Sequence, residues 1–198
     1  MKKQTILFLL GTFLISGCAT RVVERLDTAE TVDLSTRWND TDSRATAAEM
    51  VKEALAKPWV DRFQAVHGKA PTVIIGTVLN KSHDHIPTET FTKDLERELF
   101  NSGRVTFVAA KGERDEIRDE RADQQANASR ETVTRNKNET GANYMLKGVI
   151  NSFEDQADKK TYQYFQVTLE MIDMEKNTKV WYGDKKIKKL MTKKKFGF

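Results

Sequence analysis

Residues 72–79 read TVIIGTVL, a nearly continuous apolar run that is rich in β-branched side chains. Such a run predicts a strand that is buried on both faces of a sheet. The next element is expected to be a helix that begins near Thr88 and ends at residues 101–103. Its apolar side chains recur at helical spacing: Phe91, Leu95 and Leu99. A buried strand followed by an amphipathic helix indicates a sheet with helices packed against it.

Three further strands are expected in the C-terminal part of the chain, joined by polar segments that are typical of hairpin connections. They span residues 144–152, 162–174 and 179–187. The second strand alternates between apolar side chains (Phe165, Val167, Leu169, Met171) and polar ones (Gln166, Thr168, Glu170). This period of two predicts one buried face and one solvated face.

The remaining segments complete a predicted order of α, β, α, β, α and a β-meander. The pattern predicts a helix at residues 45–57 with a further turn or two over residues 59–66, a short strand at 104–110 and a polar, solvated helix within 111–139. The predicted fold class is therefore α+β, an α/β sandwich with a mixed sheet of about four to five strands flanked by helices.

The first residues have the order of a bacterial signal peptide, with Lys2 and Lys3 before an apolar run at residues 6–15. That run is about half the roughly 20 residues that a membrane-spanning helix needs. The segment LISGC at residues 14–18 resembles the lipobox of bacterial lipoproteins. The resemblance implies that the signal is cut before Cys18 and that Cys18 carries lipid, while Ala19 resembles the outer-membrane class.

The predicted organisation follows from that anchor. We expect a signal peptide at residues 1–17, the lipidated Cys18 and a flexible tether at 18–44, a globular domain at 45–190 and a basic tail at 191–198. Cys18 is the only cysteine, so no disulfide can form within the chain. We expect no cofactor other than the covalent lipid.

Charge does not favour a nucleic-acid partner. The formal net charge is +4, and it falls to +2 once Lys2 and Lys3 are removed with the signal peptide. The basic C-terminal segment can attract anionic lipid, glycan or an acidic protein, and it is equally well explained as a charged edge strand.

No arrangement of side chains predicts an enzyme. The nearest approach to a metal or acid–base cluster is His83-Asp84-His85, for which a solvated loop is the simpler interpretation and an unrecognised hydrolase the alternative. Acidic residues within 113–123 are interleaved with arginines, which indicates ion pairs on a helix surface. We therefore expect neither catalysis nor a small-molecule substrate.

Several stretches of the domain resemble one family. They lie at residues 78–82, 85–88, 91–103, 107–108, 141–148, 165–169 and 177–183. Across about residues 70–190 the chain resembles the LpoB-type penicillin-binding protein activators, and similar α/β domains occur in periplasmic translocation proteins such as the amino-terminal domain of TolB.

The resemblance implies an outer-membrane lipoprotein that binds the small regulatory domain of a class A bifunctional penicillin-binding protein and stimulates its glycosyltransferase and transpeptidase activities. The chemistry would belong to the partner. The alternative is a structural or assembly-associated periplasmic lipoprotein with a non-synthase partner.

Candidates for the partner-binding surface come from the residues themselves, because exposed aromatic and charged groups on a rigid rim are common binding anchors. They are Asn80, Lys81 and Thr88 around the predicted 80–88 loop, the aromatic Tyr182, and the basic pair Lys185 and Lys186.

Overall fold

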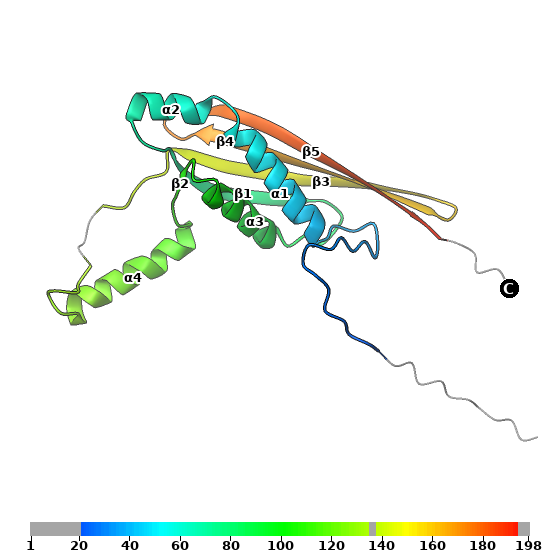
Figure 1. Ribbon diagram of the computed structural model, residues 1–198, viewed down its shortest axis with the longest axis horizontal. Helices are drawn as coiled ribbons and strands as arrows, with labels where there is room; N and C mark the ends of the chain where they lie inside the picture. The colour runs from blue at the N-terminus through cyan, green and yellow to red at the C-terminus, as the bar shows by residue number, and fades with distance from the viewer. Residues whose placement is uncertain (1–20, 135–137, 194–198) are drawn as a thin grey trace, which may run out of the picture. The chain divides into compact units, whose positions relative to one another are not determined.

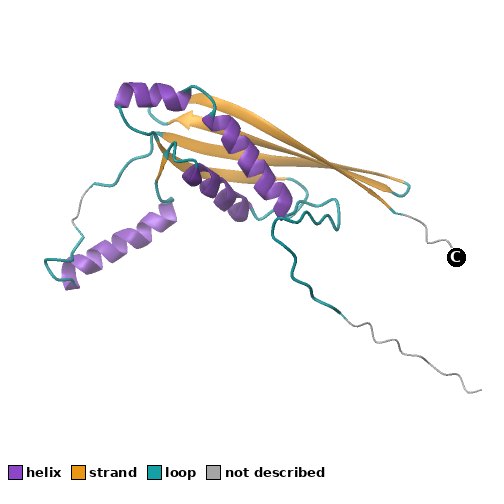
Figure 2. Ribbon diagram, in the orientation of Figure 1, coloured by secondary structure: helices purple, strands orange, loops and turns teal. Residues whose placement is uncertain are grey.

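The computed structural model describes residues 21–134 and 138–193, and the elements within them form an α+β fold (Figures 1 and 2). The predicted signal peptide and Cys18 lie outside the described residues. The elements are α1 (Asp40–Leu55), α2 (Trp59–His67), β1 (Thr72–Lys81), α3 (Thr88–Asn101), β2 (Thr106–Phe107), α4 (Lys111–Asn127), β3 (Tyr144–Ala157), β4 (Lys160–Asp173) and β5 (Thr178–Thr192). All of them belong to the compact unit that begins at Thr31.

The strands form one five-stranded mixed sheet in the order β2-β1-β3-β4-β5. The β1–β2 and β1–β3 pairs are parallel, whereas β3, β4 and β5 form an antiparallel meander. This arrangement confirms the predicted α+β class and the mixed sheet. The strand at residues 72–79 is confirmed as β1, but both of its faces are buried only over its first residues, and Leu79 is half-exposed.

Helices cover one face of the sheet, which we call the helix face (Figure 2). The alternating apolar side chains of β4 that the sequence predicted, Phe165, Val167, Leu169 and Met171, are all fully buried on this face. They pack with the buried sides of α1 and α3, including Phe91, Leu95 and Leu99 of α3. Helix α3 has the predicted bounds, and Gly103 follows it at φ +63°, a conformation that suits glycine.

The opposite face, the open face, consists of the alternate side chains of the same strands. None of the helices α1, α2 and α3 packs on it, because their buried residues join the core of the helix face. Helix α4 buries none of its side chains and is tied to α3 by an ion pair between Lys93 and Glu113. The polar, solvated helix predicted within 111–139 is thus confirmed, and it ends at Asn127.

Helix α1 begins earlier than the apolar pattern predicted, which shortens the tether that we expected to reach residue 44. Its first turn is polar and is fixed by a capping box, in which Asn39 and Asp42 exchange side-chain to backbone hydrogen bonds of 3.0 Å. The preceding Trp38 packs its ring edge-on against Phe91 and Phe165. Periodicity of apolar residues cannot detect a polar first turn, so the sequence pattern predicts a tether over residues 31–44, whereas these residues belong to the compact unit.

The meander is longer than the sequence pattern indicated. Strands β3 and β4 pair continuously from Tyr144–Asp173 to Ala157–Lys160 and are joined by Asp158 and Lys159 alone, with Asp158 at φ +52°. Strand β5 runs to Thr192, past the residue at which we placed the basic tail. The apolar pattern did not extend into these segments because many of their side chains are charged. Lysines are nevertheless common on edge strands such as β5.

None of the helices within residues 21–134 and 138–193 combines the length and apolar character that crossing a bilayer requires.

Candidate partner-binding surface

The loop between β1 and α3 is held in a fixed conformation by its own side chains. The Asn80 amide donates to the backbone oxygen of Asp84 (2.8 Å), and the Asn80 side-chain oxygen accepts from the backbone and the hydroxyl of Ser82. The backbone N–H of His83 donates to Ser152 Oγ on β3 at 3.0 Å. The candidate Asn80 is therefore engaged within the loop, where its function is to shape it.

Asp84 has a structural partner. One of its carboxylate oxygens accepts the backbone N–H of Trp38 at 3.1 Å, which ties the segment before α1 to this loop. The neighbouring His83 and His85 are exposed. No three His, Cys, Asp or Glu side chains in the described part of the chain lie together in a way that could hold a metal ion.

The other two loop candidates lie at opposite ends of the loop. Lys81 is exposed at the last position of β1 and pairs in register with Asn151 of β3. Thr88 is the first residue of α3, and its carbonyl accepts the Thr92 hydroxyl at 2.8 Å. Between them Ile86 is buried in the core, so the loop is packed against the domain.

The basic pair on β5 is divided between the two faces of the sheet. Lys185 lies opposite Val167 on the helix face and forms an ion pair with Glu49 of α1. Lys186 lies opposite Gln166 on the open face, where it forms a 3.4 Å ion pair with Asp184. Tyr182 shares the open face and is 55% exposed. Tyr182 and Lys186 can thus contact one partner together, whereas Lys185 is bound to a helix.

Lys189 is the centre of a charged cluster on the helix face. Its ammonium lies 2.6 Å from Asp42 of α1 and 2.8 Å from Asp33, and it donates to the carbonyl of Arg37 at 3.1 Å. Burial opposes the charged form of Lys189, but the hydrogen bonds to Asp33 and Asp42 outweigh it and raise the pKa of Lys189. The hydrogen bond from Lys189 also lowers the pKa of Asp33. This cluster fastens residues 33–42 to the edge strand.

Sequence reasoning missed a group of aromatic side chains on the open face. Phe153 and Tyr164, which are direct cross-strand neighbours, stack with ring centroids 4.6 Å apart, and Tyr162 lies 6.3 Å from Phe153. Leu190 lies opposite Tyr162 and is 63% exposed. The signal was present, because the alternation that buries Phe165 places Tyr164 and Tyr162 on the same face as Gln166.

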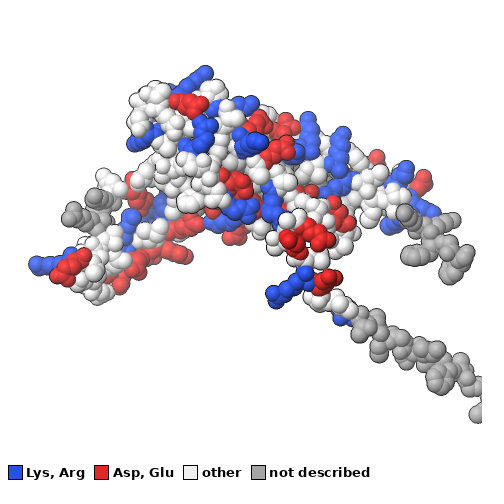
Figure 3. All heavy atoms as spheres, viewed as in Figure 1, with Lys and Arg blue, Asp and Glu red and all other residues white. Residues whose placement is uncertain are grey.

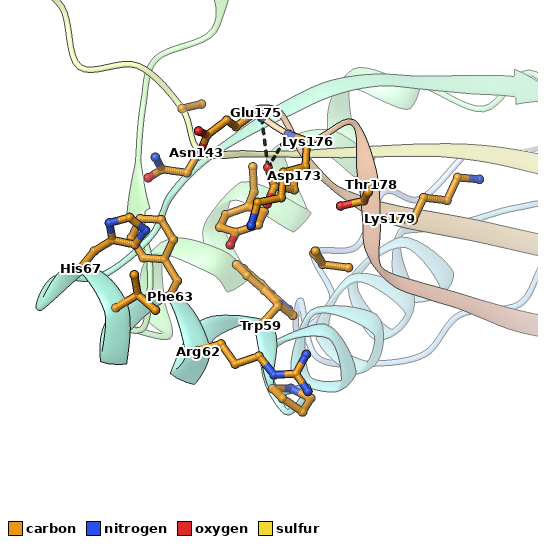
Figure 4. Close-up of a pocket in the computed structure, with 15 residues that line it drawn as sticks. Trp59, Arg62, Phe63, His67, Asn143, Asp173, Glu175, Lys176, Thr178 and Lys179 are labelled. Atoms are coloured by element: carbon orange, nitrogen blue, oxygen red, sulfur yellow. Dashed lines mark hydrogen bonds between the residues drawn. The ribbon is translucent and has the colours of Figure 1, made fainter.

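A groove of about 540 Å³ lies beside α2 (Figure 4). It is lined by residues of α2, by the start of β3, by the end of β4 and by the start of β5. Trp59 and Phe63 of α2 pack against Tyr144 at centroid distances of 4.8 and 5.7 Å. Burial raises the pKa of the Tyr144 hydroxyl, and the charge of Asp173 adds to the effect. Asp173 accepts the backbone N–H groups of Glu175 and Lys176 at 3.0 Å and so shapes the β4–β5 turn. None of the sequence-predicted candidates lines this groove.

Comparison with known proteins connects the domain to one family. The family model described as peptidoglycan-synthase activator LpoB matches residues 42–187. Among solved structures, the LpoB C-terminal domain from Salmonella enterica is 16% identical with a TM-score of 0.36, covering 66% of this chain and 93% of that chain. Lipoprotein GNA1162 from Neisseria meningitidis is 13% identical with a TM-score of 0.40, covering 60% and 83% respectively. The NMR structure of Escherichia coli LpoB is 13% identical with a TM-score of 0.37, covering 97% and 91%. The comparison with curated proteins gives no match.

Proposed function

Because the chain belongs to the LpoB family of peptidoglycan-synthase activators, we propose that it is a lipid-anchored protein of the outer membrane that binds and activates a class A bifunctional penicillin-binding protein. The observation that carries the proposal is the family match, which spans residues 42–187 and so covers most of the compact unit. In this role the protein is a binding partner, and the glycosyltransferase and transpeptidase reactions both take place in the synthase.

The anchor proposed at Cys18 sets how far the domain can reach. The compact unit begins at Thr31, about 13 residues after Cys18. Fully extended, such a segment spans at most about 45 Å, and as a flexible coil its mean span is about 20 Å. These spans are shorter than those of a tether to residue 44, so we expect the partner's docking domain to approach the outer membrane.

Replacing Cys18 by alanine should remove the protein from the outer-membrane fraction. Burial of acyl chains contributes about 0.8 kcal/mol per CH₂, and stable anchoring takes more than one chain. Cell fractionation and mass spectrometry of the N-terminal peptide measure the outcome, with Cys18→Ser as a second variant that also lacks the thiol. Recovery of either variant in the outer membrane would contradict the lipid anchor.

Activation is tested with the full-length protein, expressed in its own bacterium and purified in detergent, and the class A synthases of that organism. We expect faster glycan polymerisation, more crosslinking, or both, in its presence. The control is the same protein after heat unfolding, which keeps its composition and lipid. An absence of binding and of stimulation with every class A synthase of the organism would reject the activator function and favour a non-synthase partner.

A further inference from the structure

The lysines of β5 differ in what they contact on the two faces of the sheet. On the helix face, Lys185 and Lys189 are neutralised by Glu49, Asp33 and Asp42. Acidic and basic side chains are correspondingly intermixed over the helices (Figure 3). On the open face, Lys186 is paired with Asp184. Lys188, two positions further along β5 on the same face, forms no ion pair within the described residues. The positive charge of this strand that is left over therefore lies on the open face.

Lysines without ion pairs also lie on the open face of the neighbouring strands. Register places Lys81 of β1, Lys147 of β3 and Lys160 of β4 on the open face, and none of them forms an ion pair among the described residues. The acids of this face are Asp155, Asp184 and Glu170, and the last two already pair with Lys186 and Lys179. The open face thus presents more unpaired lysines than carboxylates.

An apolar centre lies among these charges. The stacked rings of Phe153 and Tyr164 lie beside Lys188 in one row across β3, β4 and β5, two positions beyond the residue of β3 that pairs with the end of β1. Phe153 is 53% exposed, and Leu190 beside Tyr162 is 63% exposed. Aromatic side chains are enriched at the centres of protein interfaces, where a polar rim surrounds them. Beyond the helices the sheet continues as an uncovered β3–β4–β5 arm (Figure 1).

We propose that this aromatic–lysine face, formed by Phe153, Tyr162, Tyr164, Lys160 and Lys188, docks an acidic, partly apolar surface of the peptidoglycan synthase. The inference rests on the proposed function and specifies the surface that performs it. Charge complementarity identifies the partner's chemistry, because unpaired lysines around an apolar centre favour carboxylates around an apolar patch. The rings supply contact area, and the lysines raise the rate of encounter.

The test compares two variants of the full-length protein for binding to the class A synthase. Lys160→Glu with Lys188→Glu reverses the rim charge, and we expect the dissociation constant to rise at least tenfold and its salt dependence to weaken. Tyr164→Ala removes one ring of the stack, and we expect a rise of at least tenfold with unchanged salt dependence. The matched control is Lys69→Glu with Lys111→Glu, which makes the same charge change at exposed positions away from this face. We expect the control to change the constant less than twofold.

A second measurement separates a protein partner from a lipid surface. The lipoprotein is placed in nanodiscs of neutral lipid or of lipid containing phosphatidylglycerol, and the acetylation rates of Lys160 and Lys188 are measured with and without the synthase. We expect the synthase to protect both lysines and phosphatidylglycerol to leave them reactive. Protection by phosphatidylglycerol alone would overturn the proposal in favour of a membrane surface.

The outcomes also distinguish this surface from the function on which it rests. Wild-type stimulation of the synthase, combined with unchanged binding by both variants, would reject the aromatic–lysine face and leave the activator function intact. Failure of the wild-type protein to bind any class A synthase would reject both.

Discussion

Replacing Phe165 by alanine is expected to lower the free energy of unfolding by about 3–5 kcal/mol, the range for truncating a fully buried phenylalanine. Phe165 has no exposed surface and lies in the core between the sheet and the helices. Its ring also meets Trp38 edge-on at 5.5 Å. The cavity left by the truncation would therefore weaken both the core and the attachment of the segment before α1, as urea unfolding followed by circular dichroism would measure.

Tyr164 is the matched control for this change, because it is the next residue on the same strand and points to the opposite face. Its truncation leaves no cavity in the core, and it removes a half-exposed aromatic stack worth about 1 kcal/mol. Phe165→Ala should thus lose mainly stability to unfolding, whereas Tyr164→Ala should lose mainly affinity for the synthase. Equal losses of stability would contradict the assignment of the two faces.

The contrast between these neighbours explains which parts of the fold were predictable. A strand with one buried face repeats every second residue, so the pattern in β4 was sufficient to place Phe165, Val167, Leu169 and Met171 in the core. Helix α3 was equally predictable, since its three apolar positions and the glycine that follows its C-terminus are local signals.

Segments whose strands carry charge were predicted too short. In β5 lysines occupy both faces beyond Gly183, and the ones that face the helices are stabilised by acids far away in the sequence. Lys189 and Asp42 are 147 positions apart, so no local pattern could reveal that they meet. For the same reason the local pattern predicts a tether in the segment before α1, whereas Asp33 and Trp38 fix that segment to the domain.

Of the candidate binding residues, some could be placed from the local strand pattern and others depend on contacts that the local pattern does not show. Tyr182 and Lys186 could have been placed on one face, and Lys185 on the other, by continuing the alternation of β4 into its neighbour β5. The role of Asn80 inside its loop was not predictable, because it depends on a turn conformation that brings the backbone oxygen of Asp84 to its amide. The aromatic–lysine face required the register of three strands, which only the structure provides.

Replacing Lys189 by methionine is expected to lower the free energy of unfolding by about 3 kcal/mol. Its side chain is 12% exposed and that of Asp42 is 10% exposed, so removing the ammonium leaves a buried carboxylate without its partner. The loss also leaves Asp33 with the Asn39 amide in place of an ammonium, which should loosen residues 33–39. Hydrogen exchange of the backbone N–H groups of residues 37–39, together with urea unfolding, measures the two effects.

Acid provides a second readout of the same contact. Lys189 lowers the pKa of Asp33 in the folded protein, so this pair stabilises the fold above the ordinary pKa of aspartate and loses its contribution as the pH falls through the lowered value. The contribution is small because half of the Asp33 side chain is exposed. We expect the wild-type protein to lose more stability than Lys189→Met when the pH is lowered from 5 to 3.

The double variant Asp42→Asn with Lys189→Met decides whether the unpaired charge is the cause. Asparagine at position 42 keeps an oxygen that can accept the N–H of Asn39, so the cap of α1 is preserved while the buried charge is removed. If the loss comes from an uncompensated carboxylate, the double variant should recover more than half of the stability lost by Lys189→Met. A double variant as unstable as Lys189→Met would show instead that the lysine acts through the packing of its carbon chain against the strand edge.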